Sequence, residues 1–435
     1  MRKNIIDANR DGIQAALDRA ISKGAAAKIK FGHKEAASCQ FDAGEIKEIG
    51  ESENIGYHIE VIKNGKRGRA SGNRMDRLNE MVDQALILAE SGSRAWFDLF
   101  PSPGPATRVL RHSSRTADLS LEEIIDACKL ISKKLKDENP DLYIRCNAER
   151  EEGESLLVTS GGLSYPDKGT QWSIIVEMMR TRGNDMLIHY DGRSWRDVNE
   201  YFDPEAIADR MIEEARRSEH IVPPPTGAQK AFLPPEMVAR LFSVFAMGLN
   251  GRHVAKNESP LAGRLGEEML DPSITIADHP HESYASGAAE IDSDGIPTRD
   301  QTLFDKGVLK MFLYDLDSAG MAGKEPTGNS SCSPWNIKVR PGRTQSSKLL
   351  GEIDEGVYVR NVLGFGQGNL INGDFSCNLG LGYRIEKGEI TGRVKNTMIS
   401  GNVYDLFKEN VVLSKDTDYE GSYPHAVIEG LQVSA

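Results

Sequence analysis

Hydrophobic and polar positions recur along the chain with the two periods that distinguish helices from strands. Apolar residues return every three to four positions over residues 5–21 and again over residues 75–90, which predicts two amphipathic helices. Asn64-Gly65 separates two strand-like stretches and predicts a hairpin, because both residues readily adopt the positive φ of a two-residue turn. The strands predicted in this region are residues 27–31, 55–62 and 66–70.

The middle of the chain carries two clear helix starts. Ser120-Leu-Glu-Glu123 is a capping box, in which the serine hydroxyl and the glutamate carboxylate each satisfy a free backbone N–H. Asp203-Pro204 combines a capping carboxylate with a proline at the first helical position. Gly161-Gly162 predicts a turn between strands. The strands predicted here are residues 143–150, 154–160 and 171–180.

The last part of the chain is dominated by strand patterns and glycine turns. One helix follows Pro234-Pro235 and ends near Gly251, and hairpins are predicted around Lys306-Gly307 and Lys387-Gly388. We therefore expect an α+β fold. Its N-terminal α/β portion would contain hairpins and helices, and its C-terminal domain would be dominated by a large, mainly antiparallel sheet with few helices.

Two proline-rich stretches predict domain boundaries. Pro101-Ser-Pro-Gly-Pro105 and Pro223-Pro-Pro-Thr-Gly227 interrupt regular structure, because proline fixes φ and has no backbone N–H to donate. The predicted units are an N-terminal α+β domain over residues 1–115, a middle α+β segment over residues 116–222 and a C-terminal β-rich domain over residues 228–435.

Composition narrows the class of function. With 39% hydrophobic and 27% charged residues the chain is an ordinary globular protein, and its net charge of −12 repels phosphate backbones, so we expect no nucleic-acid partner. No run approaches the roughly 20 apolar residues of a spanning helix, and we expect no membrane association and no signal peptide. The five cysteines are scattered without a Cys-x-x-Cys pair, which fits reduced thiols and a cytoplasmic location.

Some histidines and glycines are candidates for chemistry. In His279-Pro-His281-Glu282 the imidazoles and the carboxylate could converge on zinc if the segment is extended, but the proline favours a solvated loop, so metal binding by His279 and His281 stays open. Gly364-Phe-Gly366-Gln-Gly368 resembles a phosphate cradle, yet a turn and a strand follow it, which favours a tight turn. His253 follows the predicted helix and is interpreted as a cation at its negative end.

Acidic and thiol groups are the remaining candidates. Glu290, Asp292 and Asp294 could act as acid–base groups or bind calcium, but they lack the spacing of a calcium loop and we interpret them as a surface turn. No Gly-x-Ser-x-Gly elbow is present, and Cys332 and Cys377 are interpreted as small buried or half-buried thiols. The residues alone show no convincing catalytic set.

A series of short stretches nevertheless carries a specific resemblance, covering most of residues 229–407. They are Gly248-Leu-Asn-Gly251, Ser259-Pro-Leu-Ala-Gly263-Arg-Leu-Gly266, Leu270-Asp-Pro272, Asp294-Gly-Ile-Pro-Thr-Arg299, Lys306-Gly-Val-Leu-Lys310, Pro326-Thr-Gly-Asn329, Leu363-Gly-Phe-Gly366, Asn372-Gly-Asp-Phe-Ser376, Ile385-Glu-Lys-Gly388-Glu-Ile390 and Ile399-Ser-Gly-Asn402. In this order they resemble the TldD/PmbA family, known as modulators of DNA gyrase or peptide-maturation proteins. The first two predicted units match that family in the arrangement of their predicted elements more than in their residues.

The resemblance implies two kinds of subunit. One carries a His-Glu-x-x-x-His helix that binds zinc and cleaves peptides, and the other, PmbA or TldE, lacks the motif and pairs with the first. The motif would lie immediately before Gly248, where this chain has Phe242 and Met247 at the ligand positions and Ser243 at the general-base position. Phenylalanine offers no donor, and a thioether is a soft ligand poorly suited to hydrolytic zinc. Without the glutamate, no group there can deprotonate water.

By this resemblance we expect a PmbA-like subunit of a metallopeptidase complex that acts on unfolded peptides. The chain itself would have no catalytic residue, no metal ligand and no cofactor, and a TldD-like partner would hold the zinc in a heterodimer. Two alternatives stay open. The first is an independent metal- or thiol-dependent peptidase that uses His279, His281 or Cys332, and the second is a peptide-binding homodimeric scaffold. A gyrase-related role through a protein partner also stays open.

Overall fold

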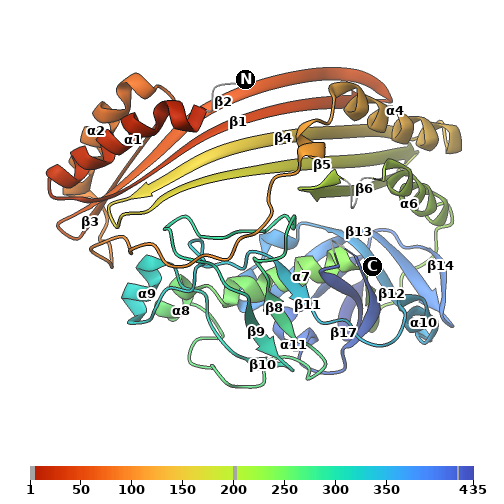
Figure 1. Cartoon of the computed structure of the whole chain (residues 1–435). Coiled ribbons are helices and arrows are strands. Elements are labelled where there is room, and N and C mark those ends of the chain that lie inside the picture. The colour runs from red at the N-terminus through yellow and green to blue at the C-terminus, as the bar shows by residue number, and fades with distance from the viewer. Residues whose placement is uncertain (1–4, 199–202, 419–420) are drawn as a thin grey trace.

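The computed structural model describes residues 5–198, 203–418 and 421–435 and confirms the predicted α+β fold. A long, curved six-stranded sheet lies over a C-terminal unit of shorter strands and helices (Figure 1). In the part of the chain that the structure describes, no helix is both long and apolar enough to cross a membrane.

The six-stranded sheet is formed by β1 (Ala26–Asp42), β2 (Glu45–Lys63), β3 (Lys66–Gly72), β4 (Tyr143–Thr159), β5 (Ser164–Arg182) and β6 (Asp185–Trp195). It is antiparallel throughout, in the order β3-β2-β1-β4-β5-β6. The hairpin predicted between β2 and β3 is confirmed, with φ of 52° at Asn64 and 68° at Gly65.

The prediction of two separate strands at residues 143–150 and 154–160 was wrong, because both belong to β4. Strand β4 runs for 17 residues and pairs along its length with β1 and β5. Its charged middle resembled a loop in the sequence. In the structure Gly153 lies between Lys34 and Gly169, so this polar stretch is held by backbone pairing on both sides.

Helices cover one face of this sheet at its two ends. They are α1 (Ile5–Ser22), α2 (Leu78–Ser91), α3 (Ser114–Ala117), α4 (Leu121–Glu138) and α6 (Pro204–Arg217). Helices α1 and α2 pack on one end of the strands, and α4 and α6 pack on the other (Figure 1). The capping box of Ser120 and Glu123 and the Asp203 cap are both confirmed.

The C-terminal unit is built around β7 (Gly227–Leu233), β12 (Glu355–Leu363), β13 (Asp374–Glu386), β15 (Met398–Asn402) and β17 (Tyr423–Ser434). Each of these strands pairs with two others of the set, and the β12–β13 pairing closes them into a ring. The pairing between β7 and β12 is parallel and the other pairings are antiparallel. Strands β14 (Glu389–Arg393) and β16 (Val412–Asp418) extend the ring, which confirms a mainly antiparallel C-terminal sheet.

Shorter elements complete this unit. A small sheet contains β8 (Ile276–Asp278), β9 (Gln301–Asp305), β10 (Val308–Leu309) and β11 (Ile337–Val339). The helices are α7 (Pro235–Gly248), α8 (Gly251–Ala255), α9 (Leu316–Ala322), α10 (Ser346–Gly351) and α11 (Val403–Leu406). Single 3₁₀ turns cover Met75–Arg77, Phe365–Gln367 and Leu370–Asn372. Helix α7 lies against β7, β12 and β17 and shares one hydrophobic core with them.

The strands on either side of residue 115 pair in the same six-stranded sheet. The division of this region into a domain over residues 1–115 and a segment over residues 116–222 stays a sequence-based prediction. The stretch from Pro223 to Gly227 leads into β7, the first strand of the ring.

Buried ion pairs join the sheet to the C-terminal unit. The Lys28 Nζ on β1 lies 2.5 Å from a carboxylate oxygen of Asp294 and 3.4 Å from one of Glu60 on β2. Glu60 also accepts a hydrogen bond from Arg67 Nε at 2.6 Å, and Arg67 Nη2 lies 2.5 Å from Asp317 in α9. These side chains are largely buried, so each charge requires its partner, and the network fixes how the sheet sits on the unit below it.

Replacing Lys28 by methionine tests this network. We expect Lys28→Met to lower the free energy of unfolding by about 3–5 kcal/mol, because Asp294 then loses its cation while it stays buried. Urea denaturation followed by circular dichroism measures the change. Lys34→Met is the control, since Lys34 forms an exposed pair with Glu151 and should cost about 0–1 kcal/mol. Equal effects of the two substitutions would contradict the assignment.

Candidate functional site

Helix α7 carries the positions that the resemblance assigns to zinc. Proline at its first position suits a helix start, because that position has no intrahelical N–H bond to lose. Apolar residues then recur at helical spacing and are buried against the ring; they are Met237, Val238, Leu241, Phe242, Val244 and Phe245. The side opposite this apolar stripe faces β6 of the six-stranded sheet across a cavity.

Phe242 is a core residue. Only 1% of its surface is exposed, and its ring lies edge-on to Phe245 and Phe407, with ring centroids 5.5 and 4.9 Å away. Ser243 is exposed and its hydroxyl donates to the backbone carbonyl of Arg240 at 2.7 Å. Met247 is half-buried against the same hydrophobic core.

These three positions do not fit a hydrolytic zinc ion. A catalytic zinc needs three nitrogen, sulfur or oxygen ligands and an open position. At 242 an aromatic ring occupies the core, at 247 there is a thioether, and the Ser243 hydroxyl has no basicity with which to activate water.

A cavity of about 290 Å³ lies between β6, the first half of α7 and β12. Its lining is polar and comes from segments far apart in the sequence: His189, Tyr190, Asp191, Gly192, Glu236, Met237, Arg240, Arg360 and Asn361. Arg360 Nε lies 3.0 Å from Glu214 of α6, and its Nη1 lies 3.3 Å from Glu236. The cavity thus has a fixed cation in one wall.

His189 lies in the wall formed by β6. Only 1% of its surface is exposed, its Nδ1 lies 3.5 Å from Asn361 Nδ2, and its Nε2 has no hydrogen-bond partner among the described residues. Burial, with a smaller contribution from the Arg360 cation, lowers the pKa of His189 to about 3. The imidazole is therefore neutral at ordinary pH. A buried ring nitrogen without a partner is costly, which favours a ligand or water beside it.

A second cavity of about 570 Å³ lies beside the first and shares Tyr190, Asp191 and Gly192 with it. It lies between the helix-free face of β5 and β6 and the C-terminal unit. Its lining includes Ile175, which is 55% exposed, and four aromatic side chains, namely Tyr190, Trp195, Trp335 and Tyr423. We refer to these two neighbouring cavities together as the groove; its end at α7 is polar and its end toward β5 is more apolar.

The two histidines of the predicted metal cluster both lie near one carboxylate. His279 Nδ1 is 3.5 Å and His281 Nδ1 is 3.7 Å from Asp300. Glu282 instead forms an ion pair with Lys338 at 2.6 Å and accepts a hydrogen bond from the Asn336 amide at 2.8 Å. The structure does not bring the three predicted ligands together.

The interpretation of the acidic cluster as a surface turn was wrong in part. The turn exists, but Glu290 is 6% exposed and Asp292 is 2% exposed. Asp292 Oδ1 accepts hydrogen bonds from the backbone N–H groups of Asp294 and Ile296, which stabilises the turn itself. Burial and the neighbouring Asp294 carboxylate raise the pKa of Asp292 to about 7. Tertiary packing that no local pattern encodes has placed these carboxyl groups inside the protein.

The other candidates have structural roles. Cys332 and Cys377 are both buried, and burial raises the pKa of the Cys332 thiol, so neither cysteine is an accessible thiolate nucleophile. Gly364, at φ 83°, opens the single turn Phe365–Gln367 rather than a phosphate-binding helix. His253 lies in the last turn of the short helix α8, and its Nδ1 is 2.9 Å from Glu258.

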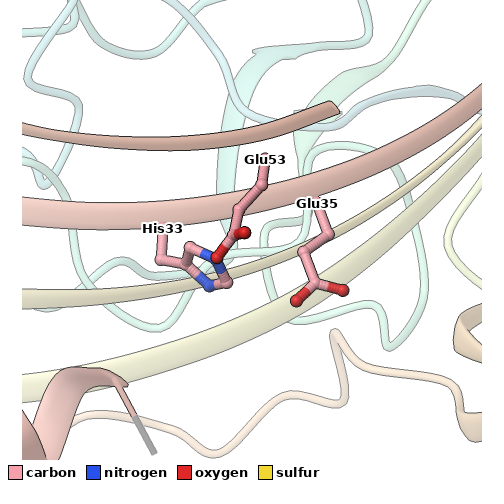
Figure 2. A group of neighbouring side chains, drawn as sticks. All are labelled: His33, Glu35 and Glu53. Carbon is pink, nitrogen blue, oxygen red and sulfur yellow. The ribbon is translucent and has the colours of Figure 1, made fainter. Parts of the chain in front are cut away.

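One further group could hold a metal. His33 and Glu35 lie two residues apart on β1 and Glu53 lies opposite Glu35 on β2, so their side chains gather on the same face of the sheet (Figure 2). The possible ligand atoms all lie within 4.8 Å of one another, the one such group of three among the described residues. His33 Nε2 lies 2.9 Å from Glu53, whose side chain is 61% exposed. An ordinary ion pair or hydrogen bond accounts for this arrangement.

Comparison with known proteins identifies the family. Residues 226–435 match the PmbA/TldA metallopeptidase C-terminal domain, and residues 27–89 match PmbA/TldA metallopeptidase domain 1. The chain belongs to the PmbA/TldD metallopeptidase family. It is 26% identical to an uncharacterized protein of Methanocaldococcus jannaschii, with 92% of this chain and 98% of that protein covered. It is also 26% identical to a metalloprotease of Methanothermobacter thermautotrophicus, with 88% and 86% covered.

Solved structures of other proteins share this fold. A Thermotoga maritima protein described as a modulator of a DNA gyrase superposes with a TM-score of 0.89 at 24% identity, with 98% of this chain and 100% of that chain covered. TldE from Thermococcus kodakarensis superposes with a TM-score of 0.86 at 22% identity and the same coverage. The PmbA/TldD assignment thus agrees with the architecture of nearly the whole chain.

Sequence analysis missed the polar cavity of this PmbA/TldD protein. His189, Glu236 and Arg360 come from three segments that meet only through the pairing of the sheet, the ring and α7. No local motif links them, and strand β6 itself was not predicted. The one indication of a polar surface there was Arg240, because it interrupts the apolar pattern of α7.

Alanine substitutions on α7 test whether position 242 is structural. We expect Phe242→Ala to lower the free energy of unfolding by about 3–5 kcal/mol, because it leaves a cavity among Phe245 and Phe407. Ser243→Ala, one position along the helix and exposed, should change it by less than about 0.5 kcal/mol. Thermal and urea unfolding measure both variants. A stable Phe242→Ala variant would show that this ring is not part of the core.

Asp292 predicts a pH dependence of stability. Because its pKa in the folded chain is raised to about 7, the folded state holds the proton more tightly than the unfolded state, and stability falls as pH rises from about 4 to about 7. Asp292→Asn cannot ionise, so at pH 8 it should be more stable than the parent by about 1–4 kcal/mol, with a smaller difference at pH 5. Unfolding curves across this pH range measure the slope. The exposed Asp137→Asn should leave the slope unchanged.

Proposed function

We propose that this chain is the non-catalytic subunit of a PmbA/TldD peptidase complex and that it binds unfolded peptide in the groove beside α7. The observation that carries the proposal is Phe242, a buried aromatic residue at the position where the resemblance expects the first zinc ligand. A family member with this packing has no metal with which to activate water, so its contribution to peptidase function lies in binding and assembly.

The groove supports the binding of an extended chain. Strand β6 pairs with β5 on one side and is the last strand of the sheet, so backbone groups of its other edge border the first cavity. Arg393 donates to the carbonyl of Met186 at 3.2 Å, and Ser286 donates to the carbonyl of Ser194 at 3.2 Å. Between these contacts Gly192 is already engaged, since its N–H donates to Asp191 Oδ1 at 2.8 Å and its carbonyl accepts from Arg193 at 2.9 Å. Along the rest of this edge a peptide could add as a further strand, which is a recurrent mode of peptide recognition. Exposed Ile175 and Tyr190 offer apolar contacts nearby.

The proposed partner is a TldD-like chain that carries the His-Glu-x-x-x-His helix and the zinc. In a heterodimer, that subunit would supply the chemistry and this chain would hold the peptide. The five cysteines are all buried and unpaired, which is compatible with the cytoplasmic location expected for such a complex. A homodimeric, peptide-binding scaffold is the competing assembly.

Metal analysis of the purified chain tests the proposal. We expect far less than one zinc ion per chain by elemental analysis and no cleavage of an unfolded peptide such as reduced, denatured casein fragments. Adding a TldD-like subunit from the same source should produce cleavage, because the zinc then comes from the partner. Stoichiometric zinc and turnover by this chain alone would refute the non-catalytic role.

Affinity purification from the source organism separates the two assemblies. We expect a chain bearing His-Glu-x-x-x-His to co-purify with this one. Recovery of the chain only as its own dimer, with peptide still bound in the groove, would favour the scaffold instead.

A further inference from the structure

The charges that line the cavity beside α7 are balanced except for one. Arg360 is paired with Glu214 and Glu236, at 3.0 and 3.3 Å. Asp191 is paired with Arg193 and Arg210, both at 2.7 Å. Each carboxylate of the lining thus already has a guanidinium partner.

Arg240 is the exception. Within the described residues no carboxylate oxygen lies within 4.0 Å of its guanidinium, and its side-chain contact is the Tyr190 hydroxyl, 3.3 Å from Nη2. This contact crosses from α7 to β6, so the guanidinium lies at the mouth of the cavity. An arginine at a cavity without a carboxylate partner is suited to an anion, and its planar fork matches a carboxylate.

The inner wall adds unsatisfied hydrogen-bonding groups. His189 Nε2 and Asn361 Oδ1 are both buried and have no partner among the described residues. Both residues line the same cavity as Arg240. A ligand that presents hydrogen-bonding groups as well as a negative charge would remove the cost of leaving these atoms unpaired.

The size and position of the cavity restrict the ligand. A volume of about 290 Å³ is at the small end of ligand sites and suits a group the size of one amino-acid residue. The cavity shares Tyr190, Asp191 and Gly192 with the larger cavity, so a group bound here lies next to a chain that follows β6 in the groove.

We propose that this cavity binds a carboxylate group of the peptide, with Arg240 as its counter-ion and the β6–β12 wall as its hydrogen-bonding surface. That the carboxylate belongs to a bound peptide rests on the proposed function. The carboxylate can come from the C-terminus of the peptide or from an acidic side chain, and the two sources are separated by the probes below.

The experiment uses the full chain and two kinds of probe. The first is N-acetylalanine, compared with N-acetylalaninamide, followed by NMR of the ¹⁵N-labelled protein. The second is a short unstructured peptide in three forms, namely the free acid, the C-terminal amide and the amide with its single internal glutamate replaced by glutamine. Fluorescence anisotropy of the labelled peptides gives their dissociation constants.

We expect N-acetylalanine to shift the resonances of Tyr190 and Gly192, and its amide to shift them at least about tenfold more weakly. Arg240→Gln should remove this difference, and Arg240→Lys should retain part of it, because a lysine keeps the charge but not the fork. Arg240 is exposed, so both variants should fold. Arg343→Gln is the matched control, since Arg343 is an exposed arginine outside both cavities and should leave binding unchanged.

The peptide forms identify the source of the carboxylate. A loss of affinity on C-terminal amidation assigns the cavity to the terminus, and a loss only on the glutamine exchange assigns it to a side chain. Equal binding of all three forms, with no response to N-acetylalanine, overturns the proposal and leaves peptide binding intact. If the chain binds N-acetylalanine but none of the three peptide forms, the carboxylate site is supported and peptide capture is refuted. A preference for the acid that survives Arg240→Gln also overturns the proposal.

Discussion

The arrangement of this protein depends on one buried guanidinium. Arg360 on β12 forms ion pairs with Glu214 of α6 and Glu236 of α7, and Glu214 also accepts a hydrogen bond from the Tyr383 hydroxyl at 2.5 Å. A charge at such depth is tolerated only while its partners are in place. This single side chain therefore links α6, the ring of strands and α7. The same arginine also lines the polar cavity and places a positive charge in its wall.

Much of the local structure could be predicted from the sequence, because short-range chemistry determines it. The capping box of Ser120 and Glu123, the Asp203 cap and the Asn64-Gly65 turn each involve residues within a few positions of one another. The sequence also identified Phe242 at a position where the resemblance expects a zinc ligand, because that motif is contiguous on one helix. The helical spacing of its apolar residues also indicated which side of that helix faces the core, and the structure confirms it and adds the rings of Phe245 and Phe407 as the neighbours of Phe242.

The rest could not be predicted because it depends on contacts between distant segments. Strand β4 continues through a run of glutamates because Gly153 is paired on both sides, and a sequence window contains neither neighbour. Asp292 is buried because the C-terminal unit meets the sheet where Lys28 lies, more than two hundred residues earlier. The candidate site combines β6, α7 and β12 in the same way. Its residues become neighbours only in the folded chain, as is usual for sites at the junction of two units.

The packing of Phe242 limits which substitutions this position can accept during evolution. A histidine introduced there would meet two aromatic rings and no polar partner, and it would lie behind the helix surface that borders the cavity. Placing a metal ligand here would thus require the aromatic cluster to be rearranged and polar donors to be added together, and each intermediate would be less stable than its parent. An exchange of histidine for phenylalanine at this position is therefore easier than the reverse exchange, because only the reverse has to open a packed core.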